Sequence, residues 1–118
     1  MKNLILFVIF GLLSSTLLSY APQTEKEIKH LYKFIKESNV KFFRNGKEHR
    51  LEDAIKHIKK KEKHYKKKIK TTEDFIKKSA MKSTMSGKYY FIKYENKKKE
   101  KCSEWLLVEL KQLRKIEK

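Results

Sequence analysis

In the segment "TTEDFIKKSAMKSTMSGKYYFIKY", residues 71–94, a pattern typical of a helix is followed by a pattern typical of a strand. Thr72 predicts a helix start, with an acidic pair directly after it that complements the positive end of the helix dipole. Gly87 is expected to end that helix, since glycine adopts backbone angles that other residues avoid. The segment "KYYFIKY", residues 88–94, is rich in residues typical of strands. One short segment therefore indicates an α+β fold.

Helical patterns surround this segment on both sides. Residues 51–70 place apolar side chains in one sector of a helix and lysines in the adjoining sector. A capping box formed by Thr24 and Glu27 predicts an earlier helix that ends near residues 38–39. Ser103 is expected to cap a final helix, in which an apolar stripe includes the single tryptophan.

A hairpin is predicted between the first two helices. The sequence "VKFFRNGKEHR", residues 40–50, places Asn45 and Gly46 where a tight turn needs positive backbone angles. The predicted order is thus helix, hairpin, helix, helix, strand, helix. We expect a mainly helical single α+β domain over residues 22–118, with the short hairpin and one further strand.

Residues 1–21 have the pattern of a signal peptide. A basic start precedes an apolar run shorter than the roughly 20 residues of a membrane span, and small residues end the segment. The alternative is an uncleaved anchor, and Pro22 disfavours a cut directly after Ala21. We expect export to the periplasm or outside the cell, with no stable membrane span after cleavage.

The chain is strongly basic, with 31 lysines and arginines, 14 acidic residues and a net charge of +17. Such a charge favours nonspecific binding to polyanions and anionic envelope components. The excess is almost entirely lysine, which is less suited than arginine to specific phosphate recognition. A lysine stripe on the helix predicted over residues 51–70 is either a polyanion-binding surface or a solvated face. The stripe consists of Lys56, Lys59, Lys60, Lys63, Lys66, Lys67 and Lys70.

The sequence gives little support for an enzyme. Cys102 is the only cysteine, so the chain has no internal disulfide, and the thiol is interpreted as packed and inert. His57 and His64 share a helix face but lie roughly 10 Å apart along its axis, too far to hold one ion. No glycine-rich phosphate loop is present. We therefore predict no metal and no cofactor, and keep a hydrolase with Ser86 or Cys102 as nucleophile as a weaker alternative.

The turn "STMSG", residues 83–87, has two interpretations. Ser83 and Ser86 can bond nearby backbone groups and Gly87 can form the turn, which makes the motif purely structural. Alternatively, the serines and a following tyrosine line a small polar site.

Four motifs together resemble the YfeK-like family of small exported bacterial proteins, a domain of unknown function. They are "FFRNGKEH" at 42–49, "AIKHIKKK" at 54–61, "TTEDFIKKSAMKSTMSGKYY" at 71–90 and "SEWL" at 103–106. The resemblance implies export and no known activity. It also directs attention to polar residues retained in the matched pattern, which we expect to meet in one ligand-binding site. The polar residues are His57, Lys61, Ser83, Ser86 and Tyr90, and Gly87 of the turn completes the predicted site.

The leading hypothesis is a non-enzymatic binding or interaction module, whose partner is an envelope protein or a small polar ligand. The alternative is a protein that binds polyanions or the anionic envelope through the lysine stripe.

Overall fold

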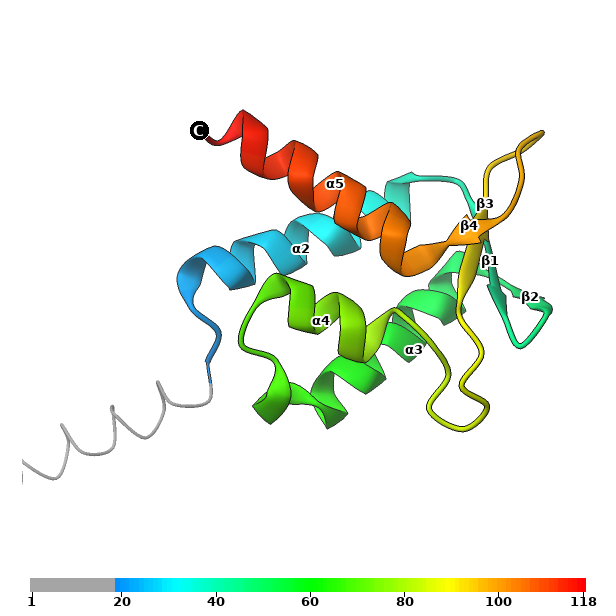
Figure 1. Cartoon of the computed structure of the whole chain (residues 1–118), viewed down its shortest axis with the longest axis horizontal. Helices are drawn as coiled ribbons and strands as arrows, with labels where there is room; N and C mark the ends of the chain where they lie inside the picture. The colour runs from blue at the N-terminus through cyan, green and yellow to red at the C-terminus, as the bar shows by residue number, and fades with distance from the viewer. Residues whose placement is uncertain (1–18) are drawn as a thin grey trace, which may run out of the picture.

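The computed structural model describes residues 19–118, and the greater part of the predicted signal peptide lies outside this range. The described chain forms four α-helices and a small sheet, which confirms the predicted α+β class (Figure 1). None of the helices in residues 19–118 is long and apolar enough to cross a membrane. In chain order the elements are α2 (Pro22–Glu37), β1 (Lys41–Arg44), β2 (Lys47–His49), α3 (Leu51–His64), the 3-10 helix η1 (Lys66–Lys68), α4 (Thr72–Ser79), β3 (Phe91–Lys93), β4 (Glu100–Lys101) and α5 (Cys102–Ile116).

The first helix begins two residues before the predicted cap. Pro22 occupies the first turn of α2, where its missing N–H is not needed and its fixed φ favours the helix. The predicted capping box is therefore wrong: Thr24 and Glu27 lie inside α2 and are buried. Glu27 instead makes tertiary contacts, described below.

The sheet is antiparallel throughout, in the order β2-β1-β3-β4. The predicted hairpin turn is confirmed, because Asn45 and Gly46 both have positive φ, at 53° and 77°. Phe42 of β1 pairs with Ile92 of β3, and both side chains face the core. The sequence did not predict β4, a two-residue strand within a lysine-rich segment.

Two helices differ in length or capping from the sequence prediction. α3 ends at His64 rather than continuing to residue 70, and η1 follows it. α4 is capped by Thr71 rather than Thr72: the Asp74 amide donates to the Thr71 hydroxyl and the Thr71 amide donates to the Asp74 carboxylate, both at 3.1 Å. Thr72 is buried and bonds to α2 instead.

The path from α4 to β3 is longer than predicted. α4 ends at Ser79, so Gly87 does not terminate it but forms a turn with φ of 73° in the loop that follows. The strand of residues 88–94 is also shorter than expected, with regular pairing confined to Phe91–Lys93 and a single bridge from Tyr89 to Lys82.

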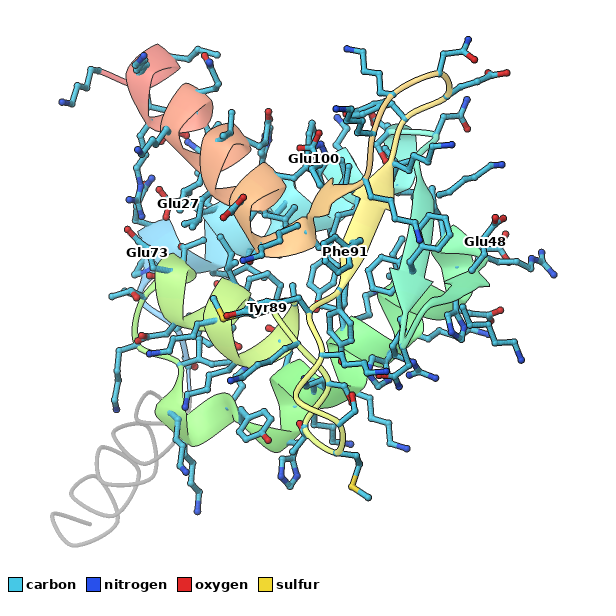
Figure 2. All side chains as sticks on the ribbon, turned by 45° about the vertical axis from the view of Figure 1, so that its right-hand side comes forward. Glu27, Glu48, Glu73, Tyr89, Phe91 and Glu100 are labelled. Carbon is cyan, nitrogen blue, oxygen red and sulfur yellow. The ribbon has the colours of Figure 1, made fainter. Side chains whose placement is uncertain are left out.

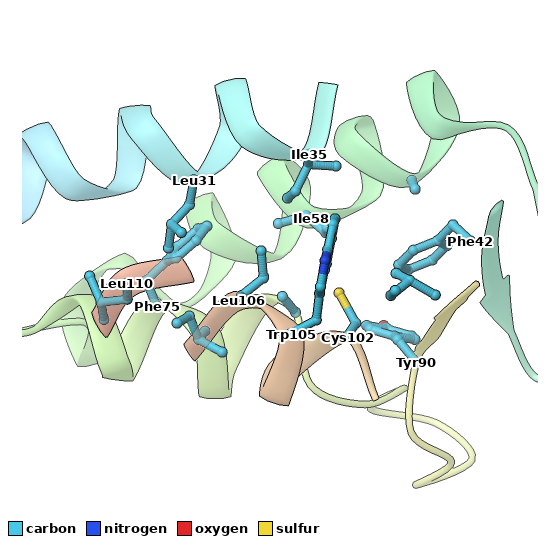
Figure 3. Close-up of a cluster of buried hydrophobic side chains, with 14 of the residues drawn as sticks. Leu31, Ile35, Phe42, Ile58, Phe75, Tyr90, Cys102, Trp105, Leu106 and Leu110 are labelled. Atoms are coloured by element: carbon cyan, nitrogen blue, oxygen red, sulfur yellow. The ribbon is translucent and has the colours of Figure 1, made fainter. Parts of the chain in front are cut away.

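The core lies between the helices and the inner face of the sheet (Figure 3). Tyr90 is fully buried against Phe42, with ring centroids 5.5 Å apart, and it lies beside the buried Cys102 in the same view. The helices supply the remaining large side chains. The fully buried ones include Leu31, Ile35, Ile58, Phe75, Ile76, Leu106 and Leu110.

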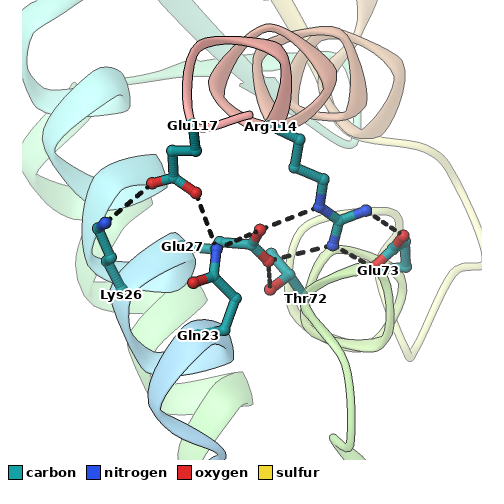
Figure 4. Close-up of polar contacts among 7 residues, drawn as sticks. All are labelled: Gln23, Lys26, Glu27, Thr72, Glu73, Arg114 and Glu117. Atoms are coloured by element: carbon teal, nitrogen blue, oxygen red, sulfur yellow. Dashed lines mark hydrogen bonds and ion pairs between the residues drawn. The ribbon is translucent and has the colours of Figure 1, made fainter.

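A polar cluster joins helices α2, α4 and α5 (Figure 4). The Glu27 side chain is only 3% exposed, and Arg114 of α5 donates to both of its oxygens, at 2.9 and 3.1 Å. Thr72 of α4 donates to the same carboxylate at 2.6 Å. Arg114 also binds Glu73, at 2.8 and 3.0 Å. The hydrogen bond from Arg114 is the main cause that lowers the pKa of Glu27 to about 2.

We predict that Arg114→Met lowers the free energy of unfolding by about 3 kcal/mol at pH 7, because it leaves a buried carboxylate without its counter-charge. The pKa of Glu27 is depressed in the folded state, so its contribution is present above about pH 4.5 and is lost as pH falls toward 2. The deficit of the variant should therefore shrink in acid. Urea denaturation at pH 7 and pH 3 measures both effects.

Arg50→Met is the matched control. Arg50 and Glu52 form an ion pair whose two side chains are each 78% exposed, so its removal should cost less than about 1 kcal/mol. Equal losses in the two variants would contradict the structural importance of the Glu27 cluster.

Candidate functional site

A pocket of about 310 Å³ opens between the hairpin, α3 and the loop that joins α4 to β3. Four of the residues predicted for a polar site line it, two from α3 and two from the segment between α4 and β3: His57, Lys61, Ser83 and Tyr90. Arg44, Asn45, Thr84 and Met85 complete the lining. Ser86 and Gly87 shape the loop but do not line the pocket.

His57 and Lys61 lie one turn apart on α3 and both reach the Tyr90 hydroxyl. His57 Nε2 is 2.9 Å from that oxygen, and Lys61 Nζ is 3.3 Å from it. Spacing of four residues places two side chains on the same face of a helix, which explains the convergence. The buried Tyr90 ring therefore positions its hydroxyl at the floor of the pocket.

Arg44 determines the tautomer of His57. Its Nη1 lies 2.9 Å from His57 Nδ1, and a guanidinium has donors but no acceptor. Nδ1 must accept this bond, so the neutral imidazole carries its proton on Nε2 and donates to Tyr90. The Tyr90 oxygen thus accepts from His57 and from Lys61, and no described residue accepts the proton of the Tyr90 hydroxyl.

Lys61 is buried, with 9% of its surface exposed, and no described carboxylate pairs with it. Its ammonium donates to the Lys82 carbonyl at 2.6 Å and to Tyr90, which uses two of its three hydrogens. Burial lowers the pKa of Lys61, and the charge of Arg44 adds to the effect. A buried cation without a counter-charge is costly for a folded protein.

The same environment keeps His57 neutral at physiological pH. Burial is the largest cause that lowers its pKa to about 4, and the positive charges of Arg44 and Lys61 lower it further. Burial likewise raises the pKa of Tyr90, so its phenol stays protonated. The pocket therefore contains two positive charges and several neutral donors.

The loop "STMSG" is a closed turn held by its own hydrogen bonds. The Gly87 amide donates to the Ser83 carbonyl at 2.9 Å, and the Ser83 amide donates to the Lys88 carbonyl at 2.9 Å. Ser86 donates to the side chain of Asn45 at 2.6 Å, which ties the loop to the hairpin. Ser86 thus has a structural role. Ser83 is buried, and its hydroxyl accepts from the Ser86 amide while its own proton has no described acceptor.

Neither proposed nucleophile has the environment of a catalytic residue. Cys102 is buried in the core at the start of α5, and burial raises the pKa of its thiol to about 12. Ser86 bonds to Asn45 and to the Lys88 amide, whereas His57 bonds to Arg44 and Tyr90. The geometry therefore contains no paired nucleophile and base at either position.

The seven lysines of the predicted stripe are all exposed, but they do not form one helical face. α3 ends before Lys66 and Lys67, which lie in η1, and Lys70 lies beyond it. Lys59 and Lys66 lie over aromatic rings, 5.3 Å from the centre of Tyr32 and 4.0 Å from that of Tyr20. Part of the stripe thus covers apolar surface.

Sequence reasoning missed Arg44, Asn45, Thr84 and Met85 as members of the site. Arg44 had a signal, because it is one of only three arginines in the chain and directly precedes the Asn45–Gly46 turn. No feature of the sequence indicates that Met85 lies at the site. It is 96% exposed at the edge of the pocket, an unusual position for a large apolar residue.

The structure is a small α+β domain with a pocket lined by the buried Lys61 and the partly buried Arg44. Residues 22–114 match the model of a family of unknown function, DUF5329, and the chain belongs to that family. No curated protein and no solved structure gives a significant match.

We predict that His57 titrates near pH 4 in the folded protein. Lys61→Met should raise this pKa, because it removes one of the positive charges that disfavour the imidazolium. Side-chain NMR of His57 across pH 3–8 measures both values. Lys63→Met, an exposed change on the same helix, is the control and should leave the titration unchanged. A His57 pKa that is the same in wild type and Lys61→Met would contradict the described proximity of the two groups.

Proposed function

We propose that the protein is a non-enzymatic binding module whose ligand occupies the pocket between the hairpin, α3 and the "STMSG" loop. The observation that carries this proposal is Lys61, a buried ammonium with a free hydrogen and no described counter-charge. Its two hydrogen bonds to neutral partners leave the charge uncompensated, and an apolar residue of the same length would avoid the cost of burying that charge.

The arrangement suits recognition more than chemistry. His57 and Lys61 both bond to the Tyr90 hydroxyl, and Ser86 joins the loop to the hairpin through its bond to Asn45. A site held in this way is organised before the ligand arrives, which lowers the entropic cost of binding.

The resemblance to the YfeK-like family supports export of the protein from the cytoplasm, with residues 1–21 as a cleaved signal peptide. The chain near the proposed cut is part of the fold, because the Tyr20 hydroxyl donates to Glu62 at 2.7 Å and Lys66 lies over its ring. Cleavage after Ala21 would remove these contacts, whereas cleavage before Tyr20 would retain them. The mass of the mature protein distinguishes cleavage after Ala21 from cleavage before Tyr20.

A thermal-shift screen of small polar compounds tests the binding proposal. We expect at least one class among anionic, neutral and cationic compounds to raise the melting temperature of the wild-type protein in a saturable way. Lys61→Met should abolish that shift, and the exposed Lys63→Met should retain it. The proposal fails if no class gives a shift that depends on Lys61.

A second candidate function is adhesion to polyanions, favoured by the exposure of all seven stripe lysines. Heparin binding should weaken steeply as salt rises, and it should weaken more in a Lys56/Lys60/Lys63→Gln variant than in a Lys97/Lys98/Lys111→Gln variant of the same net charge. Equal effects of the two variants would show that net charge, and not the stripe, determines adhesion.

A further inference from the structure

We propose that the ligand of the pocket is a compact, doubly charged oxyanion group of a small molecule, such as a phosphate monoester, bound between Arg44 and Lys61. This inference rests on the proposed binding function and specifies the chemistry of the ligand.

Arg44 differs from the other two arginines in having no carboxylate partner within residues 19–118, which favours a negatively charged ligand. Arg50 pairs with Glu52, and Arg114 pairs with Glu27 and Glu73. Arg44 is the remaining arginine of the chain, and no described carboxylate pairs with it. Glu48, the acidic residue of its own hairpin, is exposed and points outward (Figure 2).

The pocket also contains hydrogen-bond donors that have no acceptor among the described residues. Arg44 has five N–H donors and uses one on His57. Lys61 has one hydrogen left over, and the hydroxyl protons of Tyr90 and Ser83 have no described acceptor. The pocket is thus rich in unused donors and has no carboxylate in its lining. A ligand that satisfies it must supply several acceptor oxygens.

Two fixed positive charges favour a dianion over a monoanion. Arg44 contacts His57, His57 contacts the Tyr90 hydroxyl, and Lys61 contacts the same hydroxyl, so the two cations lie at the two ends of one hydrogen-bonded chain. One tetrahedral oxyanion with several oxygens can bind both cations at once, and arginine presents a planar fork that fits such oxygens.

The size of the pocket indicates that the oxyanion belongs to a larger molecule. Its volume of about 310 Å³ is about ten times the roughly 30 Å³ that one water occupies in the liquid. The exposed Met85 at the edge offers an apolar contact for the remainder of the ligand.

Calorimetric titration of the protein, produced from its full-length sequence, with sulfate and with phenyl phosphate tests the inference. Sulfate remains a dianion throughout the pH range used, so its own titration does not disturb the result. Both probes should bind one per chain, against a background of chloride at matched ionic strength. Lys61→Met and Arg44→Met should each weaken binding at least tenfold, and Arg50→Met should leave it unchanged. Arg44→Lys, which keeps the charge, should recover part of the loss.

His57 supplies an independent readout. A bound dianion offsets the charges of Arg44 and Lys61, so sulfate should raise the pKa of His57 by NMR, and Lys61→Met should reduce that shift. Binding of acetate or neutral compounds that depends on Lys61, without binding of sulfate or phenyl phosphate, overturns this inference and leaves the binding function standing. Sulfate affinity that is unchanged in Lys61→Met shows an adventitious ion only and overturns it as well. Failure of every class of probe overturns both proposals.

Discussion

Tyr90 is the residue on which the core and the site both depend. Its ring is fully buried against Phe42, and its backbone bonds to Met81 on one side and to Cys102 on the other. Its hydroxyl ends at the pocket, where His57 and Lys61 bond to it. One aromatic side chain therefore fixes the sheet to the helices and fixes two polar residues of α3 relative to each other. Because the Lys61 ammonium bonds to this hydroxyl, the side chain of Lys61 is held inside the fold.

The parts of the fold that the sequence predicted are those determined by local pattern. Apolar spacing located α2 and α5, and Asn45–Gly46 located the hairpin turn, because positive φ at both positions is a local requirement. Three of the predictions that failed concern residues with more than one available partner. Glu27, Thr72 and Ser103 are of types common at helix starts, yet all three are buried inside the fold, and the Thr72 hydroxyl donates to the Glu27 carboxylate across two helices.

The candidate site could be predicted from the sequence only in part. His57 and Lys61 could be placed together because they are one helical turn apart, and the "STMSG" turn contributed Ser83 beside them. Arg44 could not be placed there, because its approach to His57 depends on how the hairpin packs on α3. The high lysine content makes Lys61 hard to single out in the sequence. Lys61 faces the core whereas its neighbours Lys60 and Lys63 are exposed, and composition does not show this difference.

The proposed ligand lies between Arg44 and Lys61, which form the two sides of a receptor for one anionic group. A crystal structure of the protein grown with phenyl phosphate would show whether this arrangement exists. We expect density for the phosphoryl group between the Arg44 guanidinium and the Lys61 ammonium, with the phenyl ring toward Met85. An empty pocket in which Lys61 has turned outward to solvent, or in which a carboxylate of the chain itself pairs with both cations, would contradict it.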